Sequence, residues 1–149
     1  FYAWTVSVTP GLKRVNDKTY LQAFQSMNRA IQNPIFFIFF MGLVILLPLL
    51  TYFSRSLMSG EFAYVLSATI LYFAGVMAIT IFGNVPMNNT LEALEIESVS
   101  PEQMASFRLG FEIKWNRLNM IRTICSSLGF VLLIMACLQN ASLFIDYQK

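Results

Sequence analysis

Three apolar runs of membrane-spanning length restrict the fold of this chain more than any other feature. They cover residues 34–54, 63–83 and 118–138, and the hydrocarbon core of a bilayer needs about 20 apolar residues in a helix. A shorter apolar stretch, 1–9, opens the sequence and is expected to be the truncated end of a first span. Because lipid offers no partner to backbone N–H and C=O groups, each run is predicted to be a helix. The sequence therefore predicts one all-α domain over residues 1–149, an integral membrane four-helix bundle.

Composition agrees with a membrane protein and argues against several other classes. Charged residues make up 12% of the chain, whereas a soluble domain carries about 25%. The net charge of +2 is too small to favour a nucleic-acid partner. Because the chain has no histidine, the usual ligand of haem, zinc and copper is missing, and we expect no metal and no cofactor. Cys125 and Cys137 lie about 18 Å apart along one helix, which is too far for a disulfide between them.

The connection between the first two spans is expected to contain an amphipathic surface helix. Thr9-Pro10-Gly11 is expected to end the first helix, and Asp17 can cap the next one. Apolar side chains then recur on one face at helical spacing, namely Tyr20, Phe24, Met27 and Ile31. Packing over the end of the bundle is favoured over lying on the membrane, because the opposite face has few cations.

The connection before the last span is expected to contain two helix starts. Asn89 or Thr90 can cap a short helix, whose three glutamates we interpret as a solvated face. Ser100, Pro101 and Gln103 form a capping-box pattern. No proline follows Pro101, so the last helix is expected to have a cytoplasmic extension before it enters the membrane.

The distribution of cations predicts the orientation in the membrane. Eight lysines and arginines lie in or beside the two long connections, and two lie on the other side. The positive-inside rule then places the long connections in the cytoplasm and the C-terminus outside. The expected location is the inner membrane of a bacterium.

A polar stripe leads along the last helix into its apolar run. Its members are spaced by three or four residues and therefore share one helix face. A charge at the bilayer centre costs at least about 2.5–3.5 kcal/mol, so the stripe is expected to face the other helices. We call these residues the inward stripe: Arg108, Glu112, Trp115, Asn119, Arg122 and Ser126.

Amides at the cytoplasmic end of the third span are the expected partners of the inward stripe. Asn84 and Asn88 lie on either side of Pro86, and Asn28 comes from the end of the surface helix. They are predicted to line a polar pocket with an aromatic roof, together with Asn119, Arg122, Trp115, Trp4 and Tyr2. The alternative is that these groups only join helices and loops, as polar side chains do in membranes.

Four segments together resemble the anthrone oxygenase-like family of small four-span membrane proteins. They are FYAWTVSVTPGL, MNRAIQNPIF, GNVPMNNTLEAL and KWNRLNMIRT, and they extend over nearly the whole chain. Members of this family in fungal polyketide pathways oxidise an anthrone to an anthraquinone with molecular oxygen. The resemblance implies a four-span fold and, as an expectation, binding or oxidation of a hydrophobic aromatic or quinone-like molecule.

Such an oxidation needs a base for the acidic carbon of the substrate and donors for the resulting oxyanion. The geometry of the stripe makes Glu112 the candidate base, and Trp115 can stack on a flat ring. The oxyanion can be held by Arg122 or by an amide, namely that of Asn84, Asn88 or Asn119.

A non-catalytic subunit or scaffold of a larger or homo-oligomeric membrane complex is the alternative function. The second span begins with a bulky aromatic surface, and small residues in the second and third spans permit close helix approach. The aromatic residues are Phe36, Phe37, Phe39 and Phe40. The expected partners are therefore membrane lipid, and either a hydrophobic small molecule or further protein chains, without nucleic acid.

Overall fold

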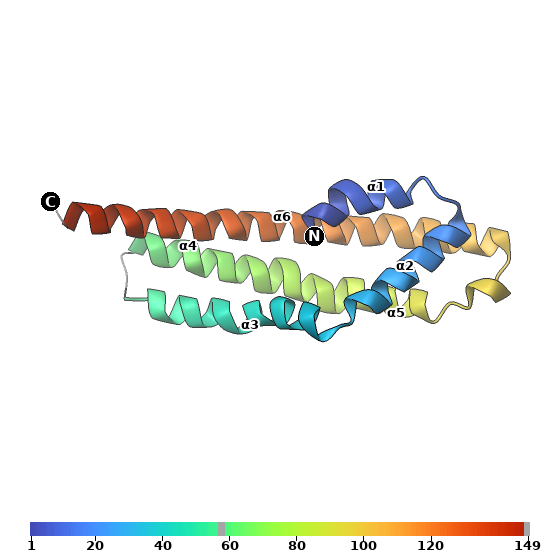
Figure 1. Cartoon of the computed structure of the whole chain (residues 1–149), viewed down its shortest axis with the longest axis horizontal. Coiled ribbons are helices and arrows are strands. Elements are labelled where there is room, and N and C mark those ends of the chain that lie inside the picture. The colour runs from blue at the N-terminus through green and yellow to red at the C-terminus, as the bar shows by residue number, and fades with distance from the viewer. Residues whose placement is uncertain (57–58, 148–149) are drawn as a thin grey trace.

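The computed structural model describes residues 1–56 and 59–147, and every regular element in that part is a helix. The long helix α6, Pro101–Tyr147, runs the length of the molecule (Figure 1). Helix α4, Ser59–Ile70, packs against α6, and α3, Pro34–Ser54, lies beside α4. Helix α2, Asp17–Ile31, crosses the N-terminal half of α6 (Figure 1). The all-α prediction is confirmed.

Three helices of the described part are long and apolar enough to cross a membrane. They are Pro34–Ser54, Gly60–Glu92 and Pro101–Gln139. The three long apolar runs are therefore confirmed as helices, and their length and composition indicate an integral membrane protein.

The N-terminal segment is helical but is not among these three candidate spans. It forms η1, a π-helical turn over Trp4–Val8, and then α1, Thr9–Leu12. The prediction that Thr9-Pro10-Gly11 ends this helix is wrong. Pro10 lies inside a helix that is continuous from Tyr2, directly after a wide π-helical turn in which the Thr9 N–H bonds to the Trp4 carbonyl. The helix ends only after Leu12.

Helix α2 is confirmed, with two corrections. Its N-cap is Asn16, whose side chain accepts a hydrogen bond from the Thr19 N–H at 2.9 Å. Asp17 is instead the first helical residue, where a negative charge suits the helix dipole. Ile31 is exposed because the buried face turns toward other residues, namely Tyr20, Leu21, Phe24, Gln25 and Asn28.

The helix of the third span continues without a break into the following connection. Helix α4 passes into the π-helical segments η2, Leu71–Ala78, and η3, Thr80–Asn84, and then into α5, Val85–Glu92. The predicted helix start at Asn89 or Thr90 is therefore wrong. The Val85 N–H bonds back five residues to the Thr80 carbonyl, and this wide turn accommodates Pro86 without ending the helix.

Two glycines let this helix approach α6 closely. A Cβ atom at Gly75 would lie 2.3 Å from the Cys125 Sγ, and one at Gly83 would lie 2.8 Å from a Leu118 methyl group. Small residues allow such backbone approach in membranes, where helices associate by packing. Cys125 and Cys137 are both free thiols.

The start of α6 follows the predicted capping box. The Gln103 side chain accepts from the Ser100 N–H at 3.0 Å, and the Ser100 hydroxyl accepts from the Gln103 N–H at 3.3 Å. From there the helix continues for 47 residues, about 70 Å at 1.5 Å per residue. This length exceeds what a bilayer core needs.

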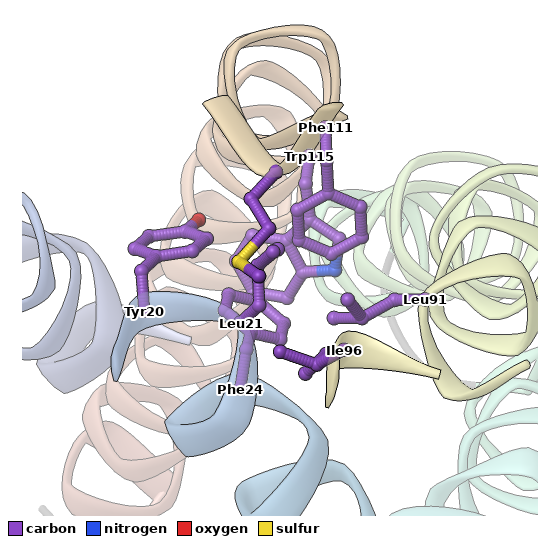
Figure 2. Close-up of a cluster of buried hydrophobic side chains, with 8 residues drawn as sticks. Tyr20, Leu21, Phe24, Leu91, Ile96, Phe111 and Trp115 are labelled. Atoms are coloured by element: carbon purple, nitrogen blue, oxygen red, sulfur yellow. The ribbon is translucent and has the colours of Figure 1, made fainter. Parts of the chain in front are cut away.

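In the described part of the chain, the larger of two hydrophobic cores lies around the N-terminal half of α6, away from the paired helices α3 and α4 (Figure 1). It gathers side chains from α2, α5, α6 and the short 3₁₀ turn η4, Ile96–Ser98 (Figure 2). Its members are Tyr20, Leu21, Phe24, Leu91, Ile96, Met104, Phe111 and Trp115. A smaller core between α3 and η2 contains Leu47, Tyr72, Val76 and Met77.

Candidate functional site

The inward stripe of α6 faces its neighbouring helices, as predicted. Trp115, Asn119 and Arg122 are buried, and Arg108 and Glu112 are largely covered. Residues on the opposite side of α6, such as Ile113 and Ile124, are exposed. The polar side chains therefore meet protein, not lipid.

Around Arg122 the stripe forms a hydrogen-bonded network, which we call the Arg122 cluster: Arg122, Asn119, Thr5, Thr80 and Thr123. Arg122 donates from Nη2 to Asn119 Oδ1 at 2.9 Å and from Nη1 to Thr80 Oγ1 at 3.2 Å. Asn119 in turn donates to the Thr5 hydroxyl at 2.9 Å, and Thr5 bonds to the Thr123 hydroxyl at 2.9 Å. Since Thr123 donates to the Asn119 carbonyl, its hydroxyl accepts from Thr5. The network joins η1, η3 and α6.

An aromatic layer lies beside the Arg122 cluster. The Trp4 and Trp115 rings are 5.4 Å apart, and Phe24 packs edge-on against both. The Trp115 indole donates to Asn88 Oδ1 at 2.8 Å, while the Arg122 guanidinium lies 5.5 Å from the Trp115 ring. The cluster thus has a flat aromatic wall with a cation next to it, an arrangement that favours stacking of a planar ring.

Several buried polar atoms near this wall have no hydrogen-bond partner among the described residues. Asn84 is 1% exposed, yet neither its amide nitrogen nor its amide oxygen is paired. The same holds for Arg122 Nε, Trp4 Nε1 and the Asn28 amide nitrogen. Asn84 lies one turn from both Thr80 and Asn88, which bond Arg122 and Trp115. Buried polar groups are normally hydrogen-bonded, so this concentration of unpaired groups marks a place where a polar ligand would gain contacts.

Glu112 belongs to a separate charged group. Its carboxylate pairs with Arg108 Nε at 3.0 Å, and Arg108 also pairs with Asp17 at 2.9 Å. The Arg108 guanidinium lies 4.4 Å from the Tyr20 ring. Burial of Tyr20 and the nearby Glu112 charge raise the pKa of its phenol. Ten positions of α6 separate Glu112 from Arg122, about 15 Å of helix, and no described hydrogen bond joins the two groups.

The structure therefore brings together most of the predicted pocket residues. Asn119 and Arg122 bond directly, and Trp4, Trp115 and Asn88 form the adjoining layer. Tyr2, predicted as part of the roof, is exposed instead.

Three threonines of the cluster were not predicted from the sequence. Thr5, Thr80 and Thr123 supply the hydroxyl groups that complete it. One signal was present, since Thr80 stands one turn before Asn84 on the face that meets α6. In the described part of the chain no three His, Cys, Asp or Glu side chains lie close enough to hold a metal ion.

Comparison with known proteins adds one match. The family model described as anthrone oxygenase matches residues 34–132, which is more than half of the chain and includes α3 to α5 and most of α6. No curated protein and no solved structure matches. The chain belongs to the anthrone oxygenase family.

Proposed function

We propose that this protein binds a flat, hydrophobic aromatic molecule of the anthrone kind beside the Arg122 cluster and oxidises it with molecular oxygen. One observation carries the proposal: unpaired buried hydrogen-bonding atoms of Asn84 and Arg122 next to the Trp4–Trp115 wall. Family membership supplies the reaction class, although family alone does not assign a site.

The site has groups suited to the developing negative charge. An anthrone that loses a proton from its methylene carbon becomes an anion with the charge on the carbonyl oxygen. Arg122 Nε and the Asn84 amide nitrogen are donors without a described partner, and donors fixed in advance in a dry site are the usual means of stabilising an oxyanion. The deprotonated carbon forms a C–O bond to O2, and the resulting peroxide takes back the proton from the base. The hydroperoxide then breaks its O–O bond and the remaining C–H bond of that carbon, which releases water. One oxygen atom remains in the quinone and the other leaves in water.

Glu112 is proposed as the base, because it is the only carboxylate of the inward stripe. Its ion pair with Arg108 would have to open for it to accept a proton. About 15 Å of helix separates its backbone from that of Arg122, whereas the acidic carbon and the carbonyl oxygen of an anthrone lie across a single ring. The proton would therefore reach Glu112 through intervening water. The roles of base and oxyanion donor are therefore separable by mutation.

The test is oxygen consumption by the purified protein in nanodiscs with anthrone as the substrate. Arg122→Met is expected to lower turnover by about 10²- to 10³-fold, the usual cost of losing one oxyanion donor. Glu112→Gln is expected to abolish base catalysis while ring binding, measured by quenching of the fluorescence of Trp4 and Trp115, persists. Arg117→Met, which removes an exposed cation of the same helix, is the control. Unchanged turnover in Glu112→Gln would exclude Glu112 as the base, and no anthrone binding by the unmodified protein would refute the whole proposal.

We further propose a four-span bundle in a bacterial inner membrane, with the long connections in the cytoplasm and the C-terminus outside. The support is the excess of cations in those connections. Cysteine labelling from each side of intact spheroplasts tests the orientation, since a residue placed near Lys13 should react only after permeabilisation.

A role as a non-catalytic subunit is the second candidate. Only 6% of the most apolar segment of α3 is buried within the chain. Exposed aromatic residues such as Phe37 and Phe39 lie on the surface of this helix. Lipid or another protein chain could cover this surface. Native mass measurement distinguishes the two functions, because a defined assembly without bound aromatic molecule favours the subunit.

A further inference from the structure

A hollow lies between α1 and α6, at the Arg108 and Glu112 end of the inward stripe. Its volume is about 790 Å³. Charged and apolar side chains both line it. The residues that line it are Thr9, Pro10, Lys13, Asp17, Ala105, Arg108, Leu109, Glu112, Ile113 and Asn116.

Arg108 contributes charge to this hollow but no free donor. Its guanidinium bonds to Glu112, to Asp17 and to the backbone carbonyls of Leu12, Lys13 and Val15, at 2.7 to 3.3 Å. These five bonds use all five N–H groups of an arginine. Two carboxylates, those of Asp17 and Glu112, therefore share one guanidinium that is fully engaged.

A separate positive charge lies at the rim. Lys13 is exposed and, among the described residues, has no ion-pair partner. Its backbone carbonyl accepts from Arg108, so its position relative to the hollow is fixed. Asp17, four residues later, is 40% exposed and uses only one described carboxylate oxygen, for Arg108. The hollow thus presents an accessible anion and an accessible cation side by side.

The position along α6 places this hollow at the depth of lipid headgroups. Its α6 residues, 105–116, directly precede the apolar run that begins at Leu118. Leu109 and Ile113 at its rim are 64% and 62% exposed. Apolar side chains this exposed beside charged ones suit the boundary between headgroups and acyl chains.

We propose that this hollow binds the headgroup of phosphatidylethanolamine. The ammonium group lies against Asp17, the phosphate lies against Lys13, and the glycerol end follows Pro10, Leu109 and Ile113. An anionic headgroup without an amine would gain Lys13 but would meet the carboxylates of Asp17 and Glu112. A choline headgroup has the same charges but no N–H to donate to a carboxylate.

The test compares lipid retention by native mass spectrometry of the full chain, released from detergent containing equal amounts of three lipids. These are phosphatidylethanolamine, phosphatidylcholine and phosphatidylglycerol with identical acyl chains. The unmodified chain is expected to retain phosphatidylethanolamine most. Lys13→Gln should lower that retention roughly fivefold, the usual value of one cation near a headgroup. The matched control is Lys114→Gln, which removes an exposed lysine of α6 outside the hollow, and it should leave retention unchanged.

Two results would overturn this assignment. Equal or greater retention of phosphatidylglycerol would show a simple cationic surface, and equal loss in Lys13→Gln and Lys114→Gln would show that the hollow is not the site. Asp17→Asn provides a second check, since it keeps the hydrogen bond to Arg108 but should remove the preference for ethanolamine over choline. Because no aromatic substrate or turnover enters these measurements, they can fail or succeed independently of the oxygenase proposal.

Discussion

Asn84 and Asn119 offer an unusually direct comparison, because they are the same residue type at nearly the same burial. Asn84 is 1% exposed and Asn119 is 2% exposed. Both amide atoms of Asn119 are hydrogen-bonded, to Thr5 and to Arg122, whereas neither amide atom of Asn84 has a partner among the described residues. Replacing each by Leu, which is similar in shape, should therefore change stability in opposite directions.

The magnitudes follow from the hydrogen bonds. An unpaired buried polar group costs about 1–3 kcal/mol, so Asn84→Leu is expected to stabilise the substrate-free protein by about that amount. Asn119→Leu loses one neutral bond and one bond to a charged donor, about 2–4 kcal/mol together. For a chain of this size, 1 kcal/mol corresponds to roughly 2–4 °C in Tm.

The measurement is thermal unfolding of both variants in the same detergent, with and without anthrone. Saturating anthrone should raise the Tm of the unmodified protein by mass action, and this rise should vanish in Asn84→Leu. If Asn84→Leu destabilises the substrate-free protein as much as Asn119→Leu does, the amide is satisfied within the fold and is not reserved for a ligand. The argument for the site would then fail.

Four further outcomes test the rest of the structure by thermal or denaturant unfolding. Arg108→Met should lower the free energy of unfolding by about 3–5 kcal/mol, because it leaves the carboxylates of Asp17 and Glu112 without their cation. The control Arg117→Met, at an exposed position of α6, should change it by less than about 0.5 kcal/mol. Gly75→Ala should cost about 1–3 kcal/mol by overpacking, and adding Cys125→Gly should recover part of that loss; no recovery would disprove the close contact. Ser100→Ala should cost about 0.5–2 kcal/mol through the lost cap. The raised pKa of Tyr20 means that the fold favours the neutral phenol, so stability should fall as the pH rises above about 10, and a Tyr20→Phe chain that shows the same fall would refute this.

Features set by short-range spacing could be predicted from the sequence. The capping box at Ser100 and Gln103 depends on neighbours three residues apart, and the inward stripe depends only on helical periodicity. Asn84 could be named because an amide at the end of an apolar helix is conspicuous. Charge and helical periodicity therefore predicted the residues that α6 contributes to the candidate site.

Two kinds of feature could not be predicted in this way. One is the exact backbone hydrogen-bonding pattern within a helix, and the other is the packing of segments that are far apart in the sequence. The helix passes through Pro86 because the preceding turn is π-helical, and nothing in the local residue pattern signals that turn. The separation of Glu112 from Arg122 by an aromatic layer was likewise hidden, because both stand on one helix face. Only the packing of Trp4 and Phe24 from other segments divides that face into two environments.

The π-helical stretch Leu71–Asn84 has a consequence for how related chains should be aligned. Each wide turn takes up one residue more than an α-helical turn, so it rotates everything that follows about the helix axis. A relative that lacks one residue within this stretch can keep its later amides facing α6 by reverting to α-helical geometry. A gap between Asn84 and Asn88 would turn the side chain at position 88 away from Trp115. Insertions and deletions in this helix should therefore fall between positions 71 and 84, and each should add or remove one residue for every π turn gained or lost.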